Sequence, residues 1–281
     1  MHHGRCLCGS VDWTASGDLQ WMSHCHCSRC RKMHGAPFAT YVMAAKDGIR
    51  MTGQEHVTRY ESSPGFVRTF CGKCGSVVPG DPWGEWVFMP AGSLTTDPGI
   101  RPEAHIFAGS KLPWYEITDA LPQHEAYPPG IDGAVLENVP QPPGGGAPRG
   151  SCLCGGVRFV LEGAPILARN CHCSRCRLAR SAAHAANVMA PVDAIRVTQG
   201  QDLIGSYKLP EARFFRQTFC RTGGGKVPRH DAARGISVAP LASFDDDPGM
   251  YPQMHIFVAS KAPWFEITDR LPQQAEYGPT T

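Results

Sequence analysis

The 13 cysteines of this 281-residue chain form short clusters that occur twice. Cys6-Leu7-Cys8-Gly9 matches Cys152-Leu153-Cys154-Gly155, and Cys25-His26-Cys27-Ser28-Arg29-Cys30 matches Cys171-His172-Cys173-Ser174-Arg175-Cys176 residue for residue. Closely spaced thiols on short loops can surround one soft cation, which is how tetrahedral zinc sites are built. The spacing therefore predicts two tandem zinc modules.

The repeat extends beyond the cysteines, because residues 104–119 return with few changes as 254–269. A repeat of this length is typical of a duplicated domain rather than of a solenoid unit. A stretch rich in proline and glycine separates the copies and reads as a linker. We predict a first copy at 1–127, a linker at 128–149 and a second copy at 150–281, with the two copies packed as a pseudo-dimer.

Apolar periodicity is short throughout and favours strands over helices. The candidate strands of the first copy are Val11–Thr14, Phe38–Met43, Gly48–Met51, Val57–Tyr60, Val67–Phe70, Trp86–Met89 and Ile106–Ala108. The 31 glycines and 25 prolines indicate many tight turns between them. We predict an all-β fold of two zinc-clasped domains, with one helical turn around residues 27–33.

The net charge of +2, from 27 basic and 25 acidic residues, gives no reason to expect nucleic acid or an anionic membrane. The small Arg29–Lys32 cluster is the densest basic run. The N-terminus lacks an apolar signal-peptide region and no stretch has transmembrane length. We expect a cytoplasmic protein with reduced thiols, and the odd cysteine count argues against a disulfide framework.

Cys6, Cys8, Cys71 and Cys74 offer four thiolates from two distant loops. Four thiolates close a zinc tetrahedron and leave no open position, so this site is predicted to staple the fold.

Cys25, Cys27 and Cys30 offer only three thiolates on one short loop. A zinc ion with three protein ligands keeps a position for water or substrate, as in catalytic sites. The alternative is that a histidine closes this site too; His26 is nearest, although both of its neighbours are predicted ligands, and His34 and His105 are the other candidates.

Three motifs together resemble the glutathione-dependent formaldehyde-activating enzyme (GFA) family: Gly4–Gly9, Cys25–Cys30 and Phe70–Gly75. The resemblance covers the whole first copy and, more loosely, the second copy from Gly150. It implies a zinc-clasped "β-tent" fold and carbon–sulfur lyase chemistry on adducts of a small thiol such as glutathione with an aldehyde such as formaldehyde. It also implies that one zinc is structural and that the other lies in the active site.

The resemblance implies active-site roles for the two C-H-C-x-x-C loops. These catalytic candidates are Cys25, Cys27, Cys30, Cys171, Cys173 and Cys176. Zinc there would hold a thiol as its reactive thiolate and polarise an aldehyde oxygen. Arg29 and Arg175 are candidates to attract a carboxylate of the thiol, or are solvated surface side chains.

The second copy departs from the family pattern where Gly223 replaces the counterpart of Cys74. Its structural site keeps Cys152, Cys154 and Cys220, with His230 or His184 as candidate replacement ligands. Gly35-Ala36-Pro37-Phe38 also becomes Ser181-Ala182-Ala183-His184. We expect the second copy to be less active or adapted to another task.

Other functions remain open from the sequence. One alternative is a non-catalytic zinc scaffold like the related domain of the centromere protein V group, and another is a thiol-based sensor that uses the exposed loop cysteines. The paired His105/His255 and Trp114/Trp264 either line a thiol pocket or, as we favour, form a core tryptophan beside a histidine that the backbone satisfies.

Overall fold

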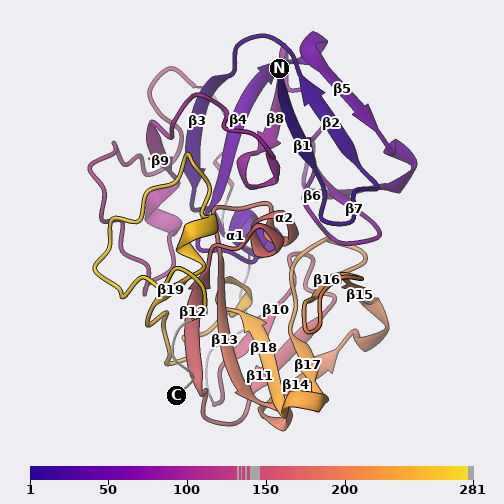
Figure 1. The fold of residues 1–281 in the computed structure, drawn as a ribbon, viewed down its shortest axis with the longest axis vertical. Helices are drawn as coiled ribbons and strands as arrows, with labels where there is room; N and C mark the ends of the chain where they lie inside the picture. The colour runs from indigo at the N-terminus through magenta and orange to yellow at the C-terminus, as the bar shows by residue number, and fades with distance from the viewer. Residues whose placement is uncertain (132, 134, 137, 140–145, 278–281) are drawn as a thin grey trace.

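The computed structural model describes residues 1–131, 133, 135–136, 138–139 and 146–277 and is built mostly of strands (Figure 1). In the first copy, the main sheet has the order β8 (Trp86–Pro90), β4 (Ala39–Ala45), β3 (Gln20–Cys25) and β9 (Ala104–Ile106). A second sheet joins β1 (His2–Arg5), β2 (Asp12–Ala15) and β5 (Ile49–Thr52), and β6 (Val57–Ser63) pairs with β7 (Phe66–Cys71). All pairs are antiparallel except β3 with β9.

The second copy repeats this order of strands and adds β17 at the edge of its main sheet. Its main sheet is β17 (Arg229–Asp231), β18 (Ile236–Pro240), β13 (Ala185–Pro191), β12 (Leu167–Cys171) and β19 (His255–Ile256). The smaller sheets are β10 (Arg149–Ser151), β11 (Arg158–Leu161) and β14 (Ile195–Gln199), and β15 (Ile204–Lys208) with β16 (Arg216–Cys220). The all-β prediction is confirmed, and each of the seven candidate strands overlaps an observed one.

The sequence did not predict β1 or β3. Strand β1 is polar, His-His-Gly-Arg, and lies in the sheet because its backbone pairs with β2. Strand β3 lies between β4 and β9 and carries the first cysteine of the three-cysteine loop at its end. Long-range pairing therefore decides both elements, and local periodicity does not reveal it.

The predicted helical turn is the two-turn helix α1 (Ser28–His34), and α2 (Ser174–Arg180) is its counterpart. Each helix begins at a cysteine: the Cys27 Sγ accepts from the Cys30 N–H, and the Cys173 Sγ accepts from the Cys176 N–H. Each helix ends at a left-handed residue, Gly35 in the first copy and a serine in the second. The caps therefore fix the cysteine loops at the helix N-termini.

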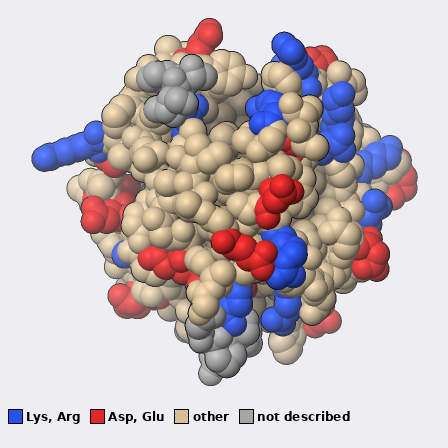
Figure 2. Space-filling model, turned by 90° about the horizontal axis from the view of Figure 1, so that it is seen from below, with Lys and Arg blue, Asp and Glu red and all other residues tan. Residues whose placement is uncertain are grey.

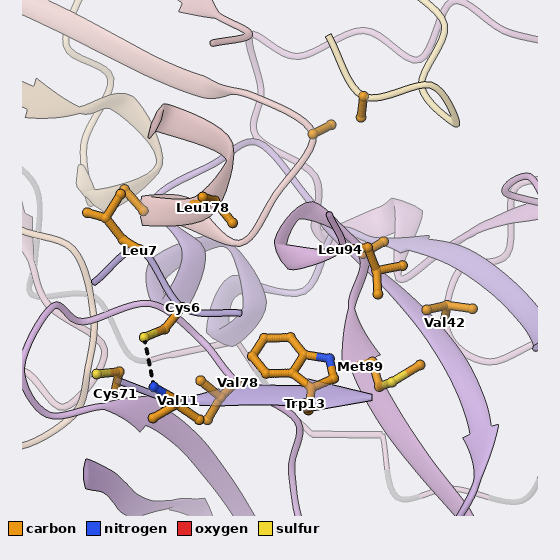
Figure 3. Close-up of a cluster of buried hydrophobic side chains, with 14 of the residues drawn as sticks. Cys6, Leu7, Val11, Trp13, Val42, Cys71, Val78, Met89, Leu94 and Leu178 are labelled. Carbon is orange, nitrogen blue, oxygen red and sulfur yellow. Dashed lines mark hydrogen bonds between the residues drawn. The ribbon is translucent and has the colours of Figure 1, made fainter. Parts of the chain in front are cut away.

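The largest apolar core contains side chains from both copies. Trp13, Cys6 and Cys71 are fully buried, and Leu178 on α2 of the second copy packs in the same cluster (Figure 3). Trp264 of the second copy also belongs to this cluster, whereas Trp114 of the first copy packs against the core of the second. The core interpretation therefore agrees with the packing of Trp264, whereas Trp114 is half-buried and packs on the outside of the second copy's core.

Helices α1 and α2 lie side by side at the centre of the molecule, where the copies meet (Figure 1). The Lys32 Nζ lies 2.6 Å from the Asp245 carboxylate, and both side chains are 2% exposed. The Lys226 Nζ donates to the carbonyls of Met33 and Gly75 across the same boundary. Lys32, at the end of the basic run Arg29–Lys32, is therefore a buried ion-pair partner.

Charges of both signs are scattered over the face seen in Figure 2, and a broad uncharged area lies above its centre. No helix in the described part of the chain is long and apolar enough to cross a membrane.

Candidate metal centres

The structure brings the 13 cysteines together in four groups, and each thiol is free of disulfide bonds. Two groups lie in the first copy and two in the second. They are Cys6/Cys8/Cys71/Cys74, Cys25/Cys27/Cys30, Cys152/Cys154/Cys220 and Cys171/Cys173/Cys176. Below, these are the four-cysteine group, the first CHC loop, the Cys220 group and the second CHC loop.

The four-cysteine group is formed by two turns, one after β1 and one after β7. The Sγ atoms of Cys6 and Cys8 lie 3.5 Å apart, and those of Cys8 and Cys71 lie 3.7 Å apart. Sulfurs at the corners of a tetrahedron with metal–sulfur bonds of about 2.3 Å are separated by about 3.8 Å. The Val11 N–H donates to the Cys6 Sγ and favours its thiolate form (Figure 3). The geometry fits one tetrahedral metal ion such as zinc.

The first CHC loop joins β3 to α1, and its three Sγ atoms lie within 4.8 Å of one another. Cys25 and Cys30 are 6% and 5% exposed, and Cys27 is more accessible. Within the described residues, no histidine or acidic side chain joins the three sulfurs as a fourth donor. The loop can therefore hold a metal from one side and leave the other side to a small molecule.

The three histidines proposed to close this site have other partners. The His34 Nδ1 donates to the Arg180 carbonyl, and its Nε2 accepts from the Tyr41 hydroxyl. The His26 Nε2 lies 2.8 Å from the His105 Nδ1, so neither ring takes part in the sulfur group. The structure therefore does not support a histidine as the fourth ligand of the first CHC loop.

A hydrogen-bonded chain of three side chains, His26, His105 and Asp119, begins within the first CHC loop. The His105 Nε2 lies 3.0 Å from both Asp119 carboxylate oxygens, and the His105 Nδ1 faces the His26 Nε2. Because a carboxylate only accepts hydrogen bonds, the proton of neutral His105 lies on Nε2 and that of His26 on its own Nε2. This leaves the His26 Nδ1 as a buried acceptor without a hydrogen-bond partner among the described residues. His105 is thus satisfied by side chains and not by the backbone.

The second copy has the same chain at the same positions. The His172 Nε2 lies 2.8 Å from the His255 Nδ1, and the His255 Nε2 lies 2.9 Å from Asp269. The His172 Nδ1 is again buried without a partner among the described residues. Sequence reasoning did not pair these residues, although the signal was available: a histidine and an aspartate 14 residues apart occur in both copies.

The second CHC loop is more open than the first. The Sγ atoms of Cys171 and Cys173 lie 3.6 Å apart, and both Cys173 and Cys176 are partly exposed. His184 replaces Phe38 and packs on the His172 ring, with 5.0 Å between ring centroids. Burial keeps the pKa of His184 well below its usual value. His184 is therefore a neutral neighbour of His172 and not a ligand of the Cys220 group.

The Cys220 group retains the sulfur geometry of its four-cysteine counterpart. Its Cys152–Cys154 and Cys154–Cys220 Sγ distances are 3.5 and 3.6 Å. His230 bonds Ser237 instead of joining this group. A Cβ placed on Gly223 would lie 3.1 Å from the Cys154 Sγ, so residue 223 borders the sulfurs where a fourth thiol would be needed.

Restoring that thiol should strengthen the second copy. We expect Gly223→Cys to tighten metal binding by the Cys220 group at least tenfold and to raise the melting temperature by a few degrees, because a fourth thiolate closes the tetrahedron. The added Cβ would lie 2.9 Å from the Cys154 Cβ, so the turn must shift slightly. Chelator competition and calorimetry measure both effects, and Gly223→Ser controls for the crowding. An unchanged affinity and melting temperature would mean that packing alone holds this copy together.

The guanidinium groups near the first CHC loop differ from those expected. Arg29 donates its Nε–H to the Ser62 carbonyl, and its counterpart Arg175 is exposed. Arg68 on β7 instead lies directly at the sulfurs: it is 8% exposed, and its Nη1 donates to the Cys30 Sγ at 3.7 Å. The sequence did not identify Arg68 as a site residue, because it lies 38 residues from Cys30. Strand β7 brings Arg68 to the sulfurs only in the folded chain.

Aromatic side chains pack around the first CHC loop. These are Trp21, Tyr41, Phe107 and Tyr127. Phe107 has a positive φ of 55°, a strained conformation for a bulky residue, and Phe257 repeats it at 59° in the second copy. Strain of this kind persists where the surroundings over-determine it, often at functional sites. The aromatic ring of Phe107 therefore forms a fixed wall beside the sulfurs.

A model of the family described as "Glutathione-dependent formaldehyde-activating enzyme" matches residues 1–110 and 147–260. The chain belongs to this family, with one match in each copy. An uncharacterized lyase of Schizosaccharomyces pombe is 27% identical over 132 residues, which cover 43% of this chain and 94% of the relative. A putative glutathione-dependent formaldehyde-activating enzyme of Halomonas elongata is 32% identical over 125 residues, which cover 41% of this chain and 79% of the relative.

A crystal structure of a Rhodobacter sphaeroides protein matches at 24% identity with a TM-score of 0.27, covering 37% of this chain and 97% of that chain.

Proposed function

We propose that this protein is a zinc-dependent carbon–sulfur lyase-type enzyme that acts on adducts of a small, glutathione-like thiol with an aldehyde such as formaldehyde. The observation that carries the proposal is the contrast between the two cysteine groups of the first copy. One group has four converging thiols, and the other has three with no further histidine or acidic donor among the described residues. The first arrangement suits a structural ion, and the second suits a site that binds a substrate.

Zinc is the ion that the donor set favours, because thiolates select soft or borderline metals and the sulfur separations fit a tetrahedron. Cys25, Cys27 and Cys30 would hold it in the first copy, and Cys171, Cys173 and Cys176 in the second. A bound zinc ion supplies Lewis acidity, which stabilises a thiolate and polarises an aldehyde oxygen.

The protein's own groups prepare this site. The Cys30 N–H donates to the Cys27 Sγ, and contacts with the Cys25 and Cys30 thiols lower the pKa of Cys27. Burial of Cys25 and Cys30 limits the access of water. The His26 backbone N–H donates to the Ile106 carbonyl and fixes the loop from β9. The thiols are thus held close together and ready to bind before substrate arrives.

We also propose the domain division 1–127 and 150–281, joined by 128–149, with the two copies packed as a pseudo-dimer. The matching strand orders and the reciprocal placement of Trp114 and Trp264 support it. The 13 free thiols suit the reducing cytoplasm.

The test combines metal quantification with turnover on thiol–aldehyde pairs. We expect Cys27→Ser to remain folded, to lose about one zinc per chain and to lose at least a hundredfold in turnover. Cys173→Ser, the matched change in the second copy, should cost less. Zinc in the loops without turnover for any thiol–aldehyde pair would favour a binding scaffold, and oxidation of the loop with zinc release would favour a sensor.

A further inference from the structure

Buried positive charge lies beside the first CHC loop, and the second copy does not repeat it. Arg31 and Arg177 occupy the same position in α1 and α2, but Arg31 is 7% exposed whereas Arg177 is only partly buried. The Arg31 Nε–H donates to the His26 carbonyl, next to the sulfurs. A second buried guanidinium accompanies Arg31 in the first copy.

In the first copy the second guanidinium belongs to Arg68. Its Nε donates to the Ser62 hydroxyl, its Nη1 donates to the Cys30 Sγ, and its Cζ lies 5.0 Å from the centre of the Phe66 ring. No aspartate or glutamate in the described ranges forms an ion pair with Arg68. Burial opposes its charge, yet the nearby Cys30 and Tyr41 groups raise the pKa of Arg68. The sulfur group is therefore its counter-charge.

In the second copy the residue equivalent to Arg68 is Gln217, which donates to the Ala179 carbonyl. An arginine is found instead at Arg180, at the end of α2, the position of His34 in the first copy. Arg180 is 8% exposed and donates to the Asn187 side chain, and burial lowers its pKa to about 10. Among the described residues, no hydrogen bond joins Arg180 to the sulfurs of the second CHC loop, so the second copy has no counterpart of the contact between Arg68 and Cys30.

The charge balance shows what such a site prefers. A divalent ion with three thiolates carries a net charge of −1, and the guanidinium groups of Arg31 and Arg68 bring the first loop and its surroundings to +1. An anionic fourth ligand makes this buried site neutral, whereas a neutral ligand leaves a net charge out of water, which is costly.

We propose that Arg68 selects an anion, specifically a thiolate, as the fourth ligand of the metal at the first CHC loop. This inference rests on the proposed function, because it requires a metal at that loop. It adds a specificity role for Arg68, which acts through its charge.

The test uses full-length, cobalt-substituted protein and two probes. 2-Mercaptoethanol binds as a thiolate without a carboxylate, and imidazole binds as a neutral ligand. The thiolate-to-cobalt absorption bands report binding, and Cys27→Ser supplies the background from the other groups. We expect Arg68→Gln, which copies the second half, to weaken thiol binding at the first loop by about tenfold to a hundredfold and imidazole binding by less than about twofold.

Controls separate charge from damage. Arg59→Gln, on the neighbouring strand β6, removes an exposed arginine that pairs with Asp81 and should change neither affinity. Arg68→Lys should retain most of the thiol preference.

Each failure has a distinct meaning. If Arg68→Gln binds thiol as tightly as the wild type, or loses thiol and imidazole equally, the selection role is wrong. If Cys27→Ser and the wild type give the same cobalt spectrum, the first loop holds no metal and the proposed function fails with it.

Discussion

Cys71→Ser should leave the whole chain largely unfolded at 25 °C. Binding of a structural zinc ion contributes about 10–16 kcal/mol in small zinc domains, which is comparable to the full stability of about 5–15 kcal/mol of a typical domain. Cys71 and Cys6 are both 0% exposed to solvent. They lie in the apolar core that also contains Leu178 and Trp264 of the second copy, so loss of the zinc ion disturbs this core directly. Unfolding around Cys71 therefore removes the packing surface of both copies. Circular dichroism melting and metal content measure the effect.

Serine variants in the other cysteine groups provide the matched comparison of stability, since each variant loses one sulfur. Cys27→Ser should keep a cooperative melt near that of the wild type, because the CHC loop lies outside this shared core. Cys220→Ser should lie between the two, since its group has three thiols to begin with. Equal unfolding by Cys27→Ser and Cys71→Ser would contradict the division between a structural and a substrate-binding ion.

The cysteine groups could be predicted from the sequence because each is built from short turns. Cys6 with Cys8, and Cys71 with Cys74, are close along the chain, and only the meeting of the two turns is long-range. The repeat provided a second, independent instance of the same spacing. Strands such as β4 and β7 were also predictable, because their apolar residues lie next to turn signals.

Interactions between the copies could not be predicted. Asp245 lies 213 residues from Lys32, and nothing near either residue in the sequence indicates that they pair. In the equivalent place of the second copy, Leu178 packs in an apolar core, so the repeat itself conceals the ion pair. A local run of basic residues was consistent with a solvated surface, and only the fold shows that its members face different surroundings.

The contact of Arg68 with the first CHC loop was hidden for a related reason. Arg68 and Cys30 lie 38 residues apart in the sequence, and they meet because β7 and α1 both border this loop in the folded protein.

Lowering the pH from 7.5 to 5 should destabilise the protein strongly. We expect His34 to account for a measurable part of the loss in unfolding free energy. His34 is fully buried, and its two hydrogen bonds, to the Arg180 carbonyl and from the Tyr41 hydroxyl, suit only the neutral ring. Burial, with the nearby Lys226, lowers the pKa of His34 to about 3. Other buried histidines have lowered pKa values for the same first reason, loss of hydration: His24, His26, His172 and His184.

The sign follows from which state binds the proton. Above pH about 6.5 the ring is neutral in both states, and the stability is fully present. Below it the unfolded chain takes up a proton that the folded chain refuses, so stability is lost by about 1.4 kcal/mol per pH unit for each such histidine until the pH nears 3. For His34 alone the loss at pH 5 is about 2 kcal/mol. The groups that face His34 are Lys226, Arg68, Arg180 and Tyr41, and none is an acid that could favour its protonated form.

His34→Gln tests this share, because glutamine offers one donor and one acceptor to the same partners at every pH. We expect the difference in unfolding free energy between pH 7.5 and pH 5 to shrink by about 2 kcal/mol in this variant. Denaturant titrations at the two pH values measure it, and protonation of the cysteine groups affects both proteins alike and cancels in the comparison. His3→Gln, which removes an exposed ring, should leave the pH dependence as in the wild type. An undiminished pH dependence in His34→Gln would show that His34 already carries a proton in the folded protein, and that its contacts with Arg180 and Tyr41 differ from those described.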